Sequence, residues 1–161
     1  MHEASHLISE KMIRSFLRIL PLFLLLASGI LLLKGSPLLT QPLSEGLAIP
    51  LGTLIAWLGM SMLPLSILLG IRYIRKPISL VYRKYNRLFR FLTVLGAAWG
   101  LVSFLLAGNW SLTFSSNEGF QGSDAAFDLF IGYTAFVSIL SLLSFIIFLI
   151  HHLIITLKQK R

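Results

Sequence analysis

The sequence predicts an all-α integral membrane protein whose four transmembrane helices form an up-down antiparallel bundle. Of its 161 residues, 56% are hydrophobic, and the mean hydropathy is +0.84. Soluble domains average about 45–50% apolar residues. Four stretches each approach the roughly 20 apolar residues needed to cross the hydrocarbon core of a bilayer, and the basic residues gather between and beyond them. We therefore expect one membrane domain over residues 1–161.

The predicted spans follow one another with short connections. The connection after the first span, GSPLLTQPLSEG, is rich in turn-forming residues,. The last connection, residues 109–128, contains acidic residues and no basic residue. Within it, Ser123 followed by Asp124 is typical of a helix N-cap with an acid in the first turn. We place the spans at residues 16–33, 48–71, 91–108 and 129–150.

The distribution of basic residues predicts the orientation of these spans. In a four-span arrangement, every one of the 14 Lys and Arg residues except Lys34 falls on the same side. Cytoplasmic loops carry an excess of Lys and Arg. We therefore expect both termini in the cytoplasm, with residues 72–90 as a basic cytoplasmic connection and residues 109–128 as an outer loop.

The basic connection also has an amphipathic pattern. Its apolar residues recur at spacings of three and four, from Ile71 and Ile74 through Ile78 to Phe89, with basic residues between them. This spacing is typical of a helix lying in the headgroup layer. The block could serve only as a topological anchor, as a docking face for a partner protein, or as a site for anionic lipid or phosphate. Its basic residues are Arg72, Arg75, Lys76, Arg83, Lys84, Arg87 and Arg90.

Small residues predict how the helices pack. Lipid tails are as apolar as leucine, so helices in a bilayer associate through close contact at small residues and through a few hydrogen bonds. The second and third spans each carry such residues at spacings of three and four. We expect these two spans to form a close antiparallel pair in which Gly59 and Gly100 do not face lipid. The predicted packing residues are Gly52, Ala56, Gly59, Ser66, Gly96, Gly100, Ser103 and Ala107.

The sequence offers no set of residues for catalysis, for a cofactor or for a metal. The predicted spans contain no Asp, Glu or Lys, and their one Arg is Arg18, near an end. Charged residues within spans are the usual mark of proton and ion pathways. His151 and His152 follow the last span and, being adjacent, point to different faces of a helix. The chain also has no cysteine. These observations together lead us to expect neither an enzyme nor a cofactor-binding protein.

Polar residues of the fourth span leave two interpretations open. Thr134, Ser138 and Ser141 share one face of the predicted helix. Their hydroxyls could bond to another helix, as intramembrane hydroxyls do. They could equally bond back to carbonyls of their own helix.

These features favour a non-catalytic accessory or scaffold subunit of a larger membrane protein complex. The partners would be other membrane subunits and anionic lipid headgroups on the cytoplasmic side, with residues 2–18 and 152–161 as contact segments. Nucleic acid is not expected, because the basic residues sit at the ends of apolar runs. A lipid or small-molecule transporter or channel, formed by a homo-oligomer with Thr134, Ser138 and Ser141 lining its pore, is an alternative. A redox subunit using a partner's cofactor is another. We expect the cytoplasmic (inner) membrane of a bacterium as the location.

Overall fold

The computed structural model describes residues 2–35, 37–44, 47–112, 114 and 119–159, and it is mostly helical. Four of its helices are long and apolar enough to cross a membrane, which confirms that part of the prediction. A single-turn helix and a 3-10 turn, η1 (Pro37–Thr40), lie in the connections. The helices are α1 (His2–Lys34), α2 (Leu51–Gly70), α3 (Arg72–Arg75), α4 (Leu80–Ala107) and α5 (Asp124–Gln159).

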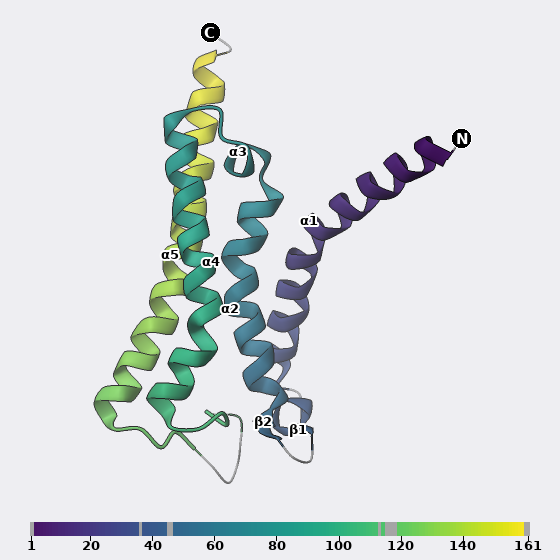
Figure 1. Cartoon of the computed structure of the whole chain (residues 1–161). Coiled ribbons are helices and arrows are strands. Elements are labelled where there is room, and N and C mark those ends of the chain that lie inside the picture. The colour runs from purple at the N-terminus through teal and green to yellow at the C-terminus, as the bar shows by residue number, and fades with distance from the viewer. Residues whose placement is uncertain (1, 36, 45–46, 113, 115–118, 160–161) are drawn as a thin grey trace.

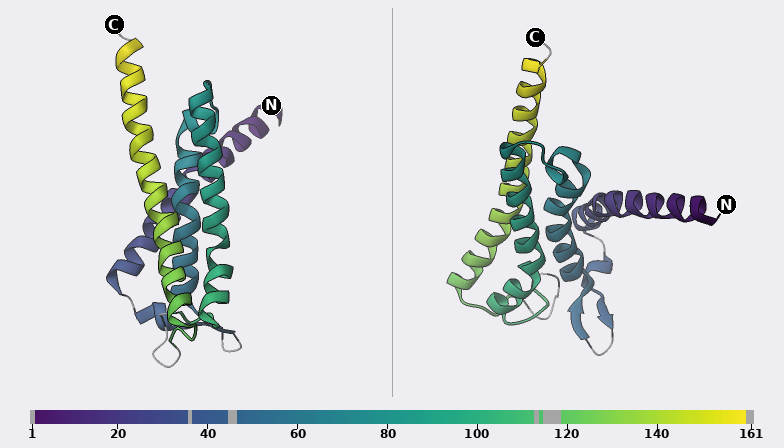
Figure 2. Two further views of the ribbon diagram at one scale, coloured as in Figure 1. Left: turned by 90° about the vertical axis from the view of Figure 1, so that its left-hand side faces the viewer. Right: turned by 45° about the horizontal axis from the view of Figure 1, so that its top comes forward.

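The long helices follow one another in alternating directions, with α2 in the middle (Figure 1). α2 contacts both α1 and α4, and α5 packs mainly on α4. The N-terminal part of α1 leaves the other helices at a wide angle, as Figure 2 also shows. Pro21 lies inside α1, and a proline within a helix removes a backbone hydrogen bond and favours a bend. Both termini lie at the end of the molecule that holds α3, here called the basic end.

A short hairpin at the opposite end, the loop end, departs from the all-α prediction. β1 (Pro42–Ser44) pairs antiparallel with β2 (Leu47–Pro50). The second predicted span began at residue 48, which is wrong, because α2 begins at Leu51. Pro50 immediately before it is extended, with φ −64° and ψ 143°. The apolar residues of β2 resemble the start of a span in composition, so hydropathy alone could not separate the strand from the helix.

α4 and α5 are longer than the spans predicted for them. The Ser79 hydroxyl accepts a bond from the backbone N–H of Tyr82 at the start of α4, and Gly108 ends that helix with φ 75°. At the start of α5, the Ser123 hydroxyl accepts a bond from the N–H of Ala126 at 3.3 Å, which confirms the predicted N-cap. The predicted spans were shorter because an apolar stretch ends at the first charged residue, whereas a helix continues to its capping residue.

The basic connection is not one helix lying along a membrane surface, so that prediction is wrong. α3 is a single turn, and α4 has already begun at Leu80. Between them, Lys76 adopts φ −121° and ψ 79°, because a residue before a proline is disfavoured in the helical region. Ile74 and Phe89 are fully buried, whereas Ile78 is 84% exposed.

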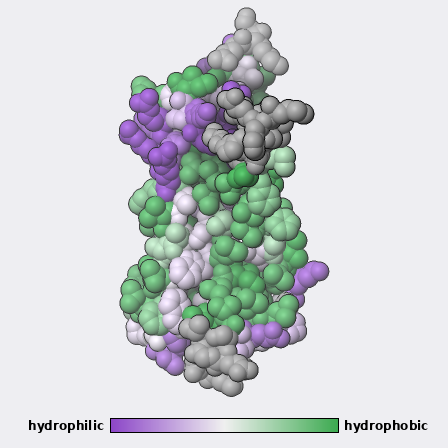
Figure 3. All heavy atoms as spheres, turned by 45° about the vertical axis from the view of Figure 1, so that its right-hand side comes forward, coloured by the Kyte–Doolittle hydropathy of each residue, from purple (hydrophilic) through white to green (hydrophobic). Residues whose placement is uncertain are grey.

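The buried residues form two clusters, one toward each end. At the basic end, Ile74 of α3, Phe89 of α4 and Phe148 of α5 pack together. At the loop end, Trp99 of α4 and Phe130 of α5 pack with the buried Leu112. Figure 3 shows apolar side chains over the middle of one face and hydrophilic side chains toward its two ends. This distribution suits a protein that spans a bilayer.

Candidate functional site

The contact between α2 and α4, here called the α2–α4 seam, depends on glycine. A Cβ atom at Gly96 would overlap the backbone carbonyl of Met60, and one at Gly100 would overlap the ring of Trp57. Both glycines are buried. α4 therefore offers a bare backbone surface on which large side chains of α2 rest.

Three successive carbonyls of α4 accept side-chain hydrogen bonds at this seam. Tyr133 of α5 donates to the carbonyl of Leu95 at 2.7 Å. The Ser61 hydroxyl lies 2.9 Å from the carbonyl of Trp57 in its own helix and 3.1 Å from that of Gly96. The indole N–H of Trp57 donates to the carbonyl of Ala97 at 2.7 Å. Water is absent from a bilayer core, so each polar group there needs a protein partner. These bonds satisfy the polar groups of α2 and α5 within the protein.

Pro64 gives a reason for the close approach at Gly96. Proline has no N–H, so the carbonyl of Met60, four residues earlier, loses its usual partner within α2. α2 nevertheless continues through Pro64 to Gly70. The backbone of Gly96 lies beside that carbonyl, where Cα–H groups form weak hydrogen bonds. A side chain at position 96 would prevent this contact.

The small-residue stripe of α2 does not lie against α4 as predicted. A Cβ atom at Gly59 would lie 3.5 Å from Cβ of Ser28 in α1, and one at Gly52 would lie 2.5 Å from the Phe114 ring at the loop end. α2 does pack on α4, but neither of these glycines of α2 lies in that contact. The face that meets α4 instead carries Trp57, whose indole N–H donates to the carbonyl of Ala97, and Ser61, whose hydroxyl lies between the carbonyls of Trp57 and Gly96. This pair of polar groups four residues apart was the sequence signal that we missed.

The remaining predicted packing residues lie in different surroundings. Ala56 and Ser66 face spaces shared with α1, and the Ser66 hydroxyl donates to the carbonyl of Leu63. Ser103 and Ala107 of α4 are buried. The Ser103 hydroxyl has no hydrogen-bond partner among the residues that the structure describes.

Two adjoining pockets form a lateral groove between α1 and α5, with α2 as its floor. The pocket nearer the loop end has a volume of about 310 Å³ and is lined by residues such as Ser28, Gly59 and Thr134. The pocket nearer the basic end has a volume of about 270 Å³. Leu25 and Leu63 line both, so the pockets are neighbours along α2. The groove follows the small-residue stripe of α2.

The hydroxyls of α5 divide between the two predicted behaviours. Thr134 donates to the carbonyl of Phe130 in its own helix and accepts from the indole N–H of Trp99 in α4, each at 2.8 Å. Ser141 donates to Val137 within α5. Ser138 donates to the sulfur of Met60 in α2 at 3.3 Å. The face that carries these hydroxyls is therefore occupied mainly by helix contacts.

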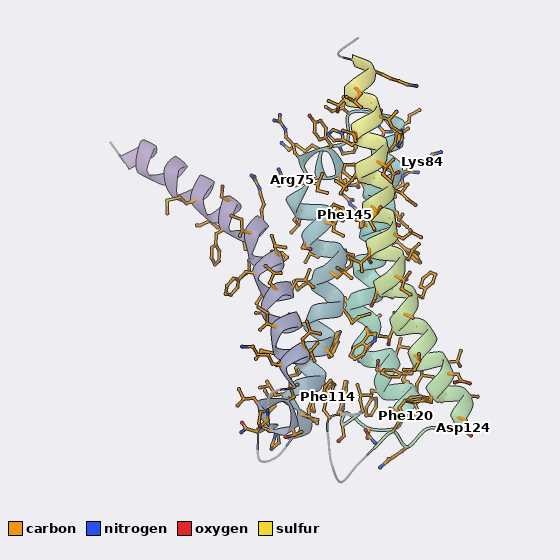
Figure 4. The ribbon with its side chains drawn as sticks, turned by 180° about the vertical axis from the view of Figure 1, so that it is seen from behind. Arg75, Lys84, Phe114, Phe120, Asp124 and Phe145 are labelled. Carbon is orange, nitrogen blue, oxygen red and sulfur yellow. The ribbon has the colours of Figure 1, made fainter. Side chains whose placement is uncertain are left out.

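The basic residues of the predicted docking block do not form one face. Arg75 of α3 is partly buried, and its Nη1 donates to the carbonyl of Leu69 at the end of α2. In Figure 4, Arg75 and Lys84 lie on opposite sides of α5 at the basic end. The block therefore divides into an α3 part beside α2 and an α4 part elsewhere. Its other members are all exposed: Arg72, Lys76, Arg83, Lys84, Arg87 and Arg90.

An aromatic cluster at the basic end contains one of the two histidines of α5. The ring of His152 lies 4.6 Å from that of Tyr73 and is stacked on Phe148, with ring centroids 5.8 Å apart. Its Nδ1 is 3.0 Å from the hydroxyl of Tyr82. His151 instead approaches the ring of Tyr85. Among the described residues, no group of three or more His, Cys, Asp or Glu side chains could hold a metal ion.

Together these features define a mostly helical protein with four helices suited to crossing a membrane. Comparisons of the chain with family models, curated proteins and solved structures find no significant match. Any functional conclusion therefore depends on the groove, the basic end and the arrangement of α1.

Proposed function

We propose that the protein is a non-catalytic accessory or scaffold subunit of a larger membrane protein complex in the cytoplasmic membrane of a bacterium. In this proposal the four long helices form an up-down antiparallel bundle, and the basic end, with both termini, faces the cytoplasm. Partner subunits and anionic headgroups would meet the protein on that side.

The arrangement of α1 is the observation that carries this proposal. In the apolar window of α1, 11% of the residues are buried, compared with 22% in α5 and 33% in α2 and in α4. α1 packs mainly on α2, and its N-terminal part then departs from the other helices (Figure 1). Ordering a helix away from its own fold gains little buried surface. Contact with another protein would supply that missing stabilisation.

Breaking the projecting part of α1 while keeping its charges tests the proposal. We expect wild-type protein, extracted gently at native expression, to retain partner subunits at fixed stoichiometry in native mass spectrometry. Met12→Pro should release them, since proline inside a helix costs about 3 kcal/mol. Met12→Ala, which preserves the helix, should retain them. Wild-type protein found alone, or equal retention by both variants, would reject the subunit proposal.

The lateral groove favours a second candidate, a transporter or channel for lipids or small molecules formed by a homo-oligomer. Its two pockets together follow α2 from the half near Thr134 to the half near Phe145. This candidate predicts a homo-oligomer without other subunits and movement of labelled lipid in reconstituted vesicles. The groove's place at the edge of the fold makes it a lipid-facing surface and not a central pore.

A further inference from the structure

We propose that the lateral groove binds one anionic phospholipid, with an acyl chain in its pocket nearer the basic end and the headgroup phosphate between Arg18 and Arg75. The ligand comes from the membrane leaflet at the basic end. The site requires no partner subunit, so it stands or falls independently of the subunit proposal.

The groove has the chemistry of an acyl-chain site. Toward the basic end it is lined by aliphatic side chains of three helices and by the Phe145 ring. The one hydroxyl there, on Ser66, already donates to the carbonyl of Leu63. Leu22 and Leu142, which line the pocket from α1 and α5, are each 48% exposed. A chain could therefore enter sideways from the bilayer.

The size of the groove favours a lipid chain over a helix of another protein. A helix of 20 residues is about 30 Å long and 10 Å wide, which corresponds to roughly 2,000 Å³. The pockets measure about 310 and 270 Å³. A methylene group is about the size of a water molecule, whose share of liquid volume is roughly 30 Å³. A helix could therefore only cover the groove from outside, whereas a thin and flexible acyl chain can lie within it.

Arg75 supplies a positive charge where the groove meets the basic end. It lies one turn beyond Ile71, which lines the pocket. Its Nη1 donates to the carbonyl of Leu69 at 2.9 Å, which holds the guanidinium beside the end of α2. A guanidinium has five N–H donors in a planar fork, so donors remain for a phosphate. Figure 4 shows Arg75 at the basic end, with Phe145 of the pocket below it.

Arg18 supplies a second charge from the opposite wall. It precedes Leu22 by four residues and Leu25 by seven, and both leucines line the groove. Residues at these spacings share one face of a helix. Arg18 is exposed and lies on the N-terminal side of Pro21, in the part of α1 that continues toward the basic end. An apolar slot with Arg75 beside its end, and with Arg18 four residues before Leu22 on the chain of its other wall, is complementary to an anionic phospholipid.

Native mass spectrometry of the full-length protein, stripped of lipid in detergent, tests this site. Phosphatidylglycerol and phosphatidylcholine with identical acyl chains are the probes. We expect wild-type protein to retain one phosphatidylglycerol in preference to phosphatidylcholine. Each Arg near an anionic headgroup is worth a factor of about 5 in affinity. Arg18→Gln with Arg75→Gln should therefore weaken binding about 25-fold, whereas Lys84→Gln with Arg87→Gln should leave it nearly unchanged.

A second pair of variants tests the groove without altering charge. Leu142→Trp, which fills the pocket nearer the basic end, should abolish retention, while Leu143→Trp on the neighbouring exposed position should not. Circular dichroism and gel filtration verify that each variant is folded. Equal retention of both lipids, or equal binding by groove and control variants, would overturn the proposal. So would a photo-crosslinker at position 142 that captures another protein instead of lipid.

Discussion

The hydroxyl of Tyr82 in α4 lies 3.0 Å from Nδ1 of His152 in α5, although 70 residues separate them in the chain. This bond ties the extension of α5 to the start of α4, at the level where Tyr73 of α3 also contacts the histidine ring. The basic end is therefore a packed junction of three helices and not a loose connection.

Removing this hydroxyl should loosen α5 at the basic end. A typical intramolecular hydrogen bond contributes about 1 kcal/mol, so Tyr82→Phe should lower the free energy of unfolding by about that amount. Backbone amides of α5 near His152 should exchange faster in hydrogen–deuterium exchange. Tyr85→Phe is the control, because the ring contacts of Tyr85 with Phe148 and His151 remain. Equal exchange in Tyr82→Phe and wild type would show that the bond is unimportant.

The α2–α4 seam should not accept a methyl group at position 96. Gly96→Ala places Cβ against the Met60 carbonyl, and such overpacking costs about 1–3 kcal/mol. Thermal unfolding in detergent should show a clear loss of stability. Gly132→Ala in α5 is the matched control, because nothing lies within 4 Å of its new methyl group and alanine favours the helix. Similar midpoints for the two variants would contradict the seam geometry.

The half-buried hydroxyl of Thr134 and the buried hydroxyl of Ser103 should respond differently to removal. Thr134→Val removes the acceptor for the indole N–H of Trp99, and a buried donor left unsatisfied costs about 1–3 kcal/mol. Ser103→Ala removes a hydroxyl without a partner among the described residues, so stability should be unchanged or higher. Urea unfolding in detergent micelles compares them. Equal losses would mean that the Trp99 bond contributes nothing.

The proposed orientation can be mapped cleanly, because the chain has no cysteine. Single cysteines replace Lys84, Asp124 or Lys158, all of which are exposed. In intact cells, a membrane-impermeant maleimide should label the cysteine at 124 and should reach positions 84 and 158 only after permeabilisation. Labelling at 84 before permeabilisation would reverse the orientation.

Hydropathy predicted the presence of the four long helices, and a capping residue predicted the start of α5. The lengths of the helices and the short helix α3 were not predicted. Hydropathy and spacing patterns failed where a local rule competed with composition. Pro77 interrupts the helix that the regular spacing from Ile71 to Phe89 suggested. The strand β2 lies within an apolar run and has the composition of a span. Hydropathy and spacing patterns are properties of several residues together, whereas a proline or a strand pairing changes the backbone at a single position.

The packing partners were harder to predict than the packing residues. Gly96 and Gly100 lie at a close helix contact, but the partner surface carries Trp57 and Met60 and not the small stripe of α2. A stripe of small residues predicts that another helix packs closely at that face, but it does not identify which helix. To predict which face of α2 packs on α1 and which on α4, the hydrogen bonds of Trp57 and Ser61 must be weighed against van der Waals contact at the small residues. The groove depends on that choice, so it could not be predicted from the sequence.

The departure of α1 from the other helices has a mechanical consequence. Because α1 lies mainly on α2, a force applied at the N terminus is transmitted to the remaining helices chiefly through that single interface. Pulling on this end should therefore separate α1 from α2 before it loads α4 and α5. The same force applied at the C terminus would load the Tyr82–His152 junction first. Force applied at the two ends of the chain therefore acts first on different helix contacts.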